Sequence, residues 1–141
     1  MASPNGKWAR HNFSCHLYFP ASEWVSLPAH EPVDPAKSIL KNLKEDPFGK
    51  QVSFFKVTTE DGITLDGWIA KPKDFDPSKK YPVFFYVYGE PWGCTVFDNS
   101  RIGRSGQFGG NIADMGYLYV SVDCRGSLAP RGREWRKSIY R

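Results

Sequence analysis

The sequence predicts an α/β fold in which a small β unit and a linker precede the first strands of a mixed sheet. Three observations predict it. Residues 51–57 and 63–69 alternate in polarity around Glu60-Asp61-Gly62, which is typical of a β-hairpin. Residues 81–88 are almost continuously apolar, as in a strand that is covered on both faces. Residues 117–122 repeat this character after a segment long enough for a crossover connection.

The composition is typical of a folded domain. The chain has 141 residues, of which 40% are hydrophobic and 24% are charged, so a disordered tail is excluded. Aromatic residues reach 16%, and with 11 Pro and 13 Gly they favour strands joined by turns over a helical bundle. The N-terminus lacks the apolar core of a signal peptide, and we expect no membrane-spanning segment in this chain.

The net charge of +4 does not indicate a nucleic-acid partner. Much of the excess lies in a C-terminal basic run that follows a strand and a loop and carries no nucleic-acid-binding motif. We interpret it as a solvated loop leading into a helix. The run comprises Arg131, Arg133, Arg136, Lys137 and Arg141.

The cysteines and histidines predict neither a metal site nor a cofactor. Cys15, Cys94 and Cys124 lie far apart and form no Cys-x-x-Cys pair, so we expect free, mostly buried thiols. His11, Cys15 and His16 lie close together in the sequence but lack a fourth ligand, which makes a zinc site unsupported.

The N-terminal 50 residues predict two segments. Asn5-Gly6 indicates a tight turn, and residues 7–11 and 23–27 have the pattern of short strands. So few strands cannot bury their own apolar faces, and they therefore look like the remains of a larger sheet. Residues 31–50 are rich in Pro, Asp and Lys, and we predict a linker there with a short helix over 36–43 that begins at Asp34-Pro35. A domain boundary is expected in this linker.

The segment between the two apolar runs is rich in glycine. Only residues 111–115 suggest a helix, and it should close at Gly116. Gly103, Gly106, Gly109 and Gly110 would each weaken a helix by about 1 kcal/mol relative to alanine.

In this order the segments resemble the dipeptidyl-peptidase IV-like branch of the prolyl-oligopeptidase superfamily. The matching motifs are residues 54–62, 65–68 and 71–72, then 81–83 and 86–91, and finally 122–127 with Arg131-Gly132-Arg133. Residues 3–7 and 25–28 are similar to the last β-propeller repeat of that branch. The resemblance implies a remnant of the last propeller blade over 1–30, a linker over 31–50, and the N-terminal part of an α/β-hydrolase (peptidase) sheet over 51–141.

The resemblance implies a serine peptidase, whose catalytic serine, aspartate and histidine follow one another in the chain, with the serine in a Gly-x-Ser-x-Gly elbow. Ser105 lies in the nearest match, but the final glycine of that motif is replaced by Gln107 and no buried strand precedes it, so we interpret it as part of a polar loop. His11, His16 and His30 all precede the hydrolase-like strands, whereas the catalytic histidine should follow them. We therefore expect a truncated chain that lacks the triad and is inactive alone.

Tyr88 is the one catalytic residue that the resemblance implies. It matches the tyrosine whose hydroxyl stabilises the oxyanion in this branch, and a neutral phenol is a suitable donor. The alternative is a tyrosine that ends an aromatic strand with its hydroxyl in water. Glu90 on the same loop is expected to lie in solvent rather than to shape a cationic pocket. Arg125 is expected to pair with a nearby carboxylate and to be structural.

Three functional interpretations stay open. The first is a fragment of a serine peptidase that removes dipeptides from N-termini and acts on a peptide substrate. The resemblance implies a parent that is secreted, periplasmic or membrane-tethered, and leaves open whether this parent is a homodimer. The second is a non-catalytic, β-rich binding or interaction module. The third is an esterase or acyl-aminoacyl peptidase of the same fold. A truncated sheet would have open edges, so we expect marginal stability and self-association.

Overall fold

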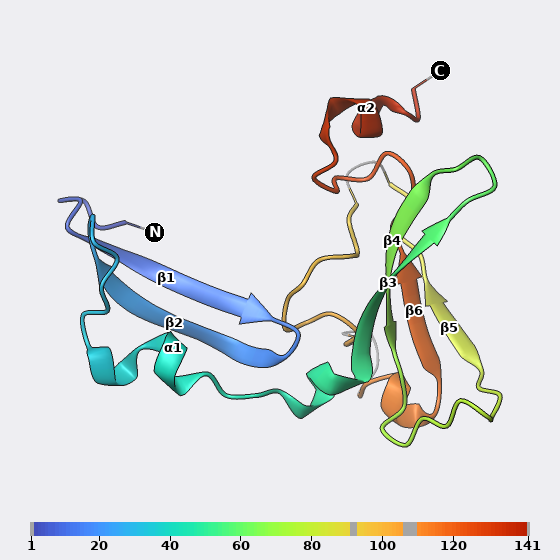
Figure 1. Ribbon diagram of the computed structural model, residues 1–141, viewed down its shortest axis with the longest axis horizontal. Helices are drawn as coiled ribbons and strands as arrows, with labels where there is room; N and C mark the ends of the chain where they lie inside the picture. The colour runs from blue at the N-terminus through green and yellow to red at the C-terminus, as the bar shows by residue number, and fades with distance from the viewer. Residues whose placement is uncertain (1, 91–92, 106–109, 141) are drawn as a thin grey trace. The chain divides into compact units, whose positions relative to one another are not determined.

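The computed structural model describes residues 2–90, 93–105 and 110–140. It divides into two compact units, the first with residues 1–50 and 98–100 and the second with residues 51–97 and 101–141. Figure 1 shows the strands and helices of each unit. The assignment of these residues to a propeller blade, a linker and a peptidase domain stays a prediction.

The first unit is built on an antiparallel hairpin. Strand β1 (Trp8–Cys15) pairs with β2 (Tyr18–Ser26), from Trp8 opposite Ser26 to Cys15 opposite Tyr18. Both strands are longer than predicted, because backbone pairing continues past the polar residues that interrupt the apolar pattern. The turn before β1 is as predicted: Gly6 has a φ of 66°, and its N–H donates to the Ser3 carbonyl at 3.0 Å.

Three short helical turns follow β2: η1 (Pro35–Lys37), α1 (Ile39–Asn42) and η2 (Pro47–Gln51). The predicted helix start is confirmed, since the Asp34 carboxylate accepts the Ala36 N–H at 3.1 Å. A single helix over 36–43 is wrong, because Ser38 is extended and separates η1 from α1. The cause is a tertiary contact: the Glu23 carboxylate on β2 accepts the Ile39 N–H at 3.1 Å, and Ile39 is buried.

The second unit contains a four-stranded mixed sheet in the order β3-β4-β6-β5 (Figure 1). Its strands are β3 (Val52–Thr58), β4 (Thr64–Ala70), β5 (Val83–Tyr86) and β6 (Leu118–Val122). The predicted hairpin is confirmed, with Val52 opposite Ala70 and Thr58 opposite Thr64. Gly62 has a φ of 81° in the turn, a conformation that glycine adopts without strain.

The connection from β5 to β6 is a crossover, as predicted, because these two strands are parallel and Val83 lies opposite Leu118. The predicted helix at 111–115 is only a 3₁₀ turn, η3 (Ala113–Met115). It closes at Gly116, whose φ of 90° ends it as expected. Gly103 also has a left-handed φ, of 73°, which an α-helix does not contain; Gly106 and Gly109 lie outside the described residues.

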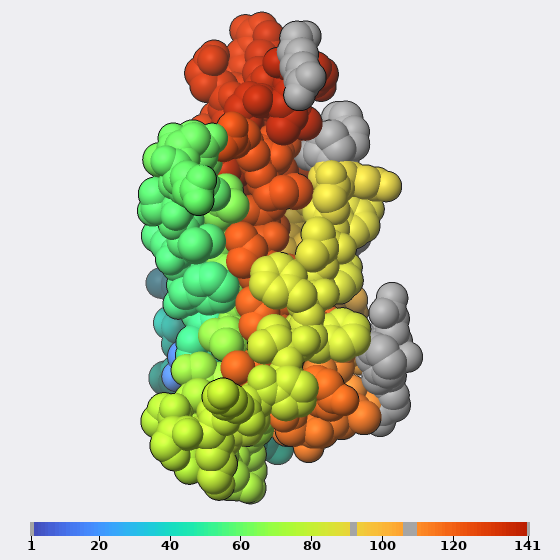
Figure 2. Space-filling model, turned by 90° about the vertical axis from the view of Figure 1, so that its right-hand side faces the viewer, coloured from blue at the N-terminus to red at the C-terminus, as the bar shows by residue number. Residues whose placement is uncertain are grey.

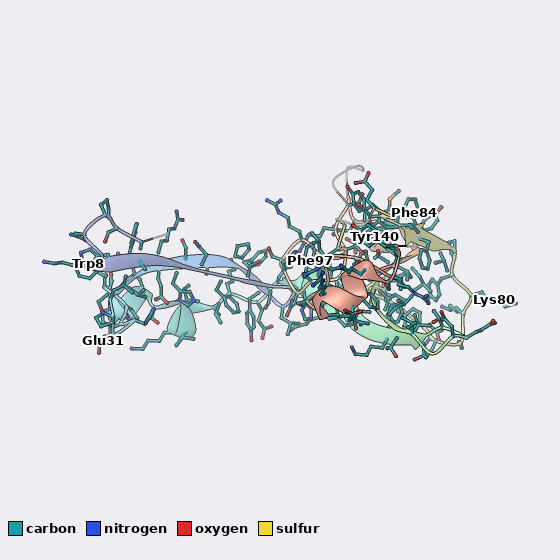
Figure 3. The ribbon with its side chains drawn as sticks, turned by 90° about the horizontal axis from the view of Figure 1, so that it is seen from above. Trp8, Glu31, Lys80, Phe84, Phe97 and Tyr140 are labelled. Carbon is teal, nitrogen blue, oxygen red and sulfur yellow. The ribbon has the colours of Figure 1, made fainter. Side chains whose placement is uncertain are left out.

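The expectation that residues 81–88 form a strand covered on both faces is wrong. The strand spans only four residues and lies at the edge of the sheet, with β6 as its single neighbour. Its side chains are not covered either, since Val83 and Phe85 are 57% and 54% exposed. Figure 2 shows β5 along the surface beside β6, and Figure 3 labels Phe84 on this strand. In contrast, the centre of β6 is buried, as predicted.

Arg133, Arg136 and Lys137 of the C-terminal basic run are exposed on helix α2 (Gly132–Lys137), as predicted for a solvated segment, whereas Arg131, directly before the helix, is half-buried. The Arg131 guanidinium lies 4.4 Å above the Trp135 ring. Arg141 lies outside the described residues. In the part of the chain that the structure describes, the α-helices are one or two turns long, and none could reach across a bilayer.

The open edge of β5 should make this chain self-associate. The Pro82 carbonyl accepts the Leu118 N–H at 2.9 Å, so by alternation the backbone groups of Val83 and Phe85 point away from β6. An uncharged edge of this kind pairs with other strands. Sedimentation velocity should detect oligomers that Phe85→Lys dissociates, because a charge blocks edge pairing. The control Leu40→Lys, at a position 85% exposed in α1, should change nothing; equal effects would contradict the prediction.

Candidate functional site

Tyr88 lies in the loop that follows β5, at the carboxyl end of the strand. Because β5 and β6 are parallel, the residues that follow both strands meet at the same end of the sheet. The Cys124 thiol, two residues after β6, contacts the Tyr88 carbonyl at 3.6 Å. In open α/β sheets this end of the strands is where ligands bind. The loop after β5 is therefore the candidate site.

The Tyr88 side chain is 43% exposed, and its hydroxyl donates to the Glu90 carboxylate at 3.1 Å. This hydrogen bond and the negative charge of Glu90 raise the pKa of the Tyr88 phenol. The phenol therefore keeps its proton and remains a hydrogen-bond donor. Glu90 is exposed, as expected, but its carboxylate also has a protein partner.

Gly93 lies against the Cδ1–Cε1 edge of the Tyr88 ring. A Cβ atom built on Gly93 would be 1.9 Å from Cδ1 and 2.4 Å from Cε1 of this ring. The Gly93 N–H also donates to the Glu90 carbonyl at 2.8 Å. Sequence reasoning did not select Gly93, because nothing local distinguishes a glycine that faces a ring from one in a turn. Pro91, the last residue of the motif matched in the sequence, lies outside the described residues, as does Trp92.

Asp123 anchors the residues that follow Gly93. It comes directly after β6 and is only 5% exposed. Its carboxylate accepts the Thr95 N–H at 2.6 Å, the Thr95 hydroxyl at 2.9 Å and the Val96 N–H at 3.3 Å. The Cys94 thiol donates to the same carboxylate at 2.9 Å. These bonds satisfy a buried charge, as its burial requires. Sequence reasoning missed this residue, although an aspartate directly after a buried strand is a usable signal.

Thr95 connects this anchor to the sheet. Its hydroxyl lies 2.8 Å from the Ser121 hydroxyl, and Ser121 in turn donates to the Tyr86 carbonyl at 2.7 Å. The indole N–H of the buried Trp68 donates to the Thr95 carbonyl at 2.9 Å. The loop is thus tied to β4, β5 and β6.

The Cys94 thiol is not a nucleophile at neutral pH. Burial, and next its hydrogen bond to the Asp123 carboxylate, raise the pKa of this thiol to about 11. A thiol reacts as its thiolate, so Cys94 is an inert, structural cysteine. All three cysteines are free, as expected, but each is only partly buried, so the expectation of mostly buried thiols is wrong.

Two arginines brace the β3–β4 hairpin. Arg125 donates to the Asp61 carboxylate in the hairpin turn, which confirms the expected pairing. Arg131 donates to the Thr64 carbonyl and to the Asp66 carboxylate. The hydrogen bond from Lys56, which has the largest effect, and the contact with Arg131 hold the pKa of the Asp66 carboxyl below its usual range. These contacts are structural rather than catalytic.

Acid should weaken the second unit through Asp66. The pKa of this carboxyl is lower in the folded chain than in the unfolded chain. The carboxylate therefore stabilises the fold fully at pH values above its pKa in the unfolded chain, about 3.9. This stabilisation is lost as the pH falls through the lower pKa of the folded chain. Thermal melting in steps below about pH 5 should show a smaller acid-induced loss for Asp66→Asn than for wild type. The control Asp74→Asn removes an exposed loop carboxylate of the same unit. If it flattens the profile as much, Asp66 is not the cause.

The other residues considered from the sequence lie elsewhere. Ser105 follows a turn at 101–103 rather than a strand, and Gly106 and Gln107 of its motif lie outside the described residues. Two histidines lie beside carboxylates in the first unit, with His11 Nδ1 3.3 Å from Glu23 and His16 Nδ1 2.7 Å from Asp98. His30 has a φ of 58° after β2. Across residues 2–90, 93–105 and 110–140, no group of three histidine, cysteine or acidic side chains is arranged to hold a metal ion.

Curated proteins are similar in sequence to this chain over most of its length. No protein-family model matches the chain. Probable dipeptidyl-aminopeptidase B of Ajellomyces capsulatus (strain G186AR) is 34% identical over 126 residues, which is 85% of this chain and 13% of the relative. Dipeptidyl peptidase 8 of Mus musculus is 34% identical over 108 residues, or 73% of this chain and 12% of that protein.

The fold is shared as well. The crystal structure of Porphyromonas gingivalis dipeptidyl peptidase 4 matches with a TM-score of 0.72 and 27% sequence identity. The match covers 99% of this chain and 20% of that one. A putative dipeptidyl aminopeptidase IV from Bacteroides ovatus matches equally well, with a TM-score of 0.72.

Sequence and fold together define a segment of a protein of the prolyl-oligopeptidase superfamily. Within that superfamily the chain belongs to the dipeptidyl-peptidase IV-like branch. It spans about one eighth of the length of the curated relatives, and its mixed sheet with few helices corresponds to a part of the solved structures.

Proposed function

We propose that this chain is part of a serine-type dipeptidyl peptidase, which hydrolyses peptide bonds and releases dipeptides from free N-termini. Its contribution to catalysis is the Tyr88 hydroxyl, which stabilises the oxyanion. The observation that carries the proposal is the position of a protonated phenol at the carboxyl end of β5, in a homologue of dipeptidyl peptidases. The chain alone is proposed to be inactive, because its sequence contains no Gly-x-Ser-x-Gly elbow and its three histidines all precede the hydrolase-like strands.

The proposed role follows from the chemistry of acyl transfer. When a serine attacks the scissile carbonyl, the carbonyl oxygen becomes an alkoxide, and donors aimed at it lower the barrier. A phenol stays neutral, so it stabilises this charge without adding one. The Tyr88 hydroxyl is exposed and free to turn from Glu90 to a substrate oxygen. The carboxylate of Glu90 competes with the oxyanion for the same proton.

Glu90 should therefore restrain catalysis. Its carboxylate lies 3.1 Å from the phenol oxygen, close to where the negative charge of the oxyanion develops. Glu90→Gln removes the repulsion between this carboxylate and the negatively charged oxyanion. In the longer protein that contains this chain, kcat should therefore rise by roughly 2- to 10-fold, as expected for the loss of one weak repulsive interaction. Initial rates measure the change. Glu60→Gln, an exposed change in the hairpin turn, is the control, and a fall in kcat for Glu90→Gln would contradict the prediction.

We also propose that residues 51–141 begin the peptidase domain, that 31–50 are the linker and that 1–30 are the end of a propeller blade. The support is the antiparallel hairpin that feeds a parallel β5–β6 pair in the second unit, and the isolated β1–β2 hairpin in the first. A two-stranded sheet buries too little surface to be stable alone, so the first unit fits a larger β structure. The proposal that the longer protein forms a homodimer rests on the resemblance only.

The experiment begins with the transcript that encodes this chain. A reading frame beyond Arg141 with Gly-x-Ser-x-Gly, then Asp and His, is expected. The longer protein should release coumarin from dipeptidyl substrates with a free N-terminus, and should leave the N-acetylated forms intact. Preference for acetyl-aminoacyl substrates or simple esters would favour the esterase or acyl-aminoacyl peptidase alternative. A frame without the triad would favour a non-catalytic module and would overturn the proposal.

A further inference from the structure

We propose that Gly93 and Asp123 are positioning residues for Tyr88. Asp123 holds residues 94–96 against the sheet, and Gly93, which directly precedes this segment, contacts the edge of the Tyr88 ring. The inference rests on the proposed function of Tyr88 as oxyanion donor. It adds two residues that act through Tyr88 and do not contact the substrate.

The sheet alone does not hold Tyr88 in place. Regular pairing of β5 with β6 ends at Tyr86, opposite Ser121, and Val87 and Tyr88 follow in the loop. Both side chains are exposed. An oxyanion donor must be held within a few tenths of an ångström of its position, because its effect depends on being preorganised. Contacts beyond the strand must therefore fix the ring.

Gly93 supplies such a contact. Because a Cβ on this residue would lie 1.9 Å from Cδ1 of the Tyr88 ring, every other amino acid would displace the ring. Gly93 does not have a φ in the left-handed region, so its backbone would accept alanine without strain. The ring contact, and not the backbone conformation, requires glycine here. Displacing the near edge of a rigid ring also moves the hydroxyl at its far end.

Asp123 holds the segment that follows Gly93 in a fixed position. Its buried carboxylate accepts four hydrogen bonds from residues 94–96, directly after Gly93. The Gly93 carbonyl itself accepts the Leu128 N–H at 3.4 Å. Asp123 is fixed in turn, because its own N–H donates to the Asp66 carbonyl on β4 at 2.9 Å. The path from sheet to phenol therefore runs from β4 and β6 through Asp123 to residues 94–96, Gly93 and the Tyr88 ring.

The test places 3-fluorotyrosine at position 88 of the 141-residue chain and follows its ¹⁹F resonance during a pH titration. In the wild type the phenol should titrate above its value in Glu90→Gln, because Glu90 accepts its proton. Gly93→Ala should shift the resonance and bring the titration to the Glu90→Gln value. The matched control is Gly110→Ala, since a Cβ at Gly110 meets no atom within 4 Å; it should leave the spectrum unchanged.

Asp123→Asn keeps the size of the side chain and removes its charge. It should change the position-88 resonance in the same direction as Gly93→Ala, and should speed iodoacetamide alkylation of Cys94 at least several-fold, because the carboxylate beside the thiol is gone. If this variant does not fold, Thr95→Val removes one of the four bonds and should give a smaller shift of the same sign. The proposal would be overturned if the ¹⁹F resonance at position 88 and its pH titration were the same as in the wild type in both tests. These tests are Gly93→Ala on the one hand and Asp123→Asn, or Thr95→Val in its place, on the other.

These outcomes are separate from those for the proposed function. In the longer protein, Gly93→Ala should lower kcat and leave KM nearly unchanged, since the donor acts on the transition state. If Tyr88→Phe does not lower kcat while the ¹⁹F results hold, the oxyanion role fails and the positioning of Tyr88 stands. If the ¹⁹F results fail while Tyr88→Phe lowers kcat, only the positioning role is lost.

Discussion

Replacing Tyr88 by phenylalanine in the longer protein should lower kcat by about 10²- to 10³-fold, the loss that follows removal of one oxyanion donor. The phenyl ring keeps the contact with Gly93, so the change removes the hydroxyl and little else. KM should change little, because the ground-state carbonyl oxygen needs this hydrogen bond less than the alkoxide does. Initial rates with a dipeptidyl-coumarin substrate measure both constants.

The control is Tyr117→Phe, which removes a hydroxyl from a tyrosine of similar exposure, 39% against 43% for Tyr88. Its kcat should stay close to that of the wild type. A Tyr88→Phe variant with unchanged kcat would show that the oxyanion is stabilised by other donors. Equal losses in both variants would point to a general effect on folding.

Replacing Trp68 by alanine should destabilise the second unit by about 3–5 kcal/mol, the usual cost of truncating a buried aromatic side chain. Trp68 is 3% exposed, on the central strand β4, and its ring meets the Tyr119 ring edge-on at 4.8 Å. The change also leaves the Thr95 carbonyl without the indole N–H that donates to it at 2.9 Å.

Hydrogen exchange of the β4 and β6 amides measures this loss in the second unit alone. The matched variant is Trp68→Phe, which keeps an aromatic ring and loses the hydrogen bond, so it should cost roughly 1–2 kcal/mol. Trp24→Ala, at a half-exposed position on β2, should leave the second unit unchanged. Equal exchange rates in wild type and Trp68→Ala would contradict the packing described for this sheet.

Local chemistry explains which parts of the fold the sequence predicts. Asp61-Gly62 specifies a turn by backbone preference, and the alternation on either side sets the register, so the β3–β4 hairpin follows from neighbours in the chain. Gly116 ends a helical turn for the same reason. The apolar run over 118–122 becomes a buried central strand because both of its neighbours, β4 and β5, are present.

The errors arise where a distant contact decides. Residues 81–88 have the composition of a covered strand, but coverage depends on elements that pack on the faces of the sheet, and Val83 and Phe85 remain more than half exposed. The predicted helix over 36–43 is interrupted because Glu23, far away in the sequence, accepts the Ile39 N–H. Helical propensity in so short a segment is too weak to resist such a contact.

The same limit applies to the site. Tyr88 is found because a resemblance marks its position, whereas Gly93 and Asp123 carry no local pattern of their own. Their importance depends on contacts between the β5 loop and the residue after β6, about 30 positions apart in the chain, as in the bond between Thr95 and Asp123. A sequence alone does not reveal such pairs unless the strand order is known.

Labelling with a fluorophosphonate probe tests the central claim most directly, because the probe forms a tetrahedral adduct on an activated serine and its oxygen occupies the oxyanion site. The longer protein should be labelled at a serine that follows position 141, more slowly in Tyr88→Phe than in wild type. The 141-residue chain should stay unlabelled. Labelling of Ser105 in the 141-residue chain, or equal rates in wild type and Tyr88→Phe, would contradict the assignment of Tyr88 as the oxyanion donor of a serine peptidase.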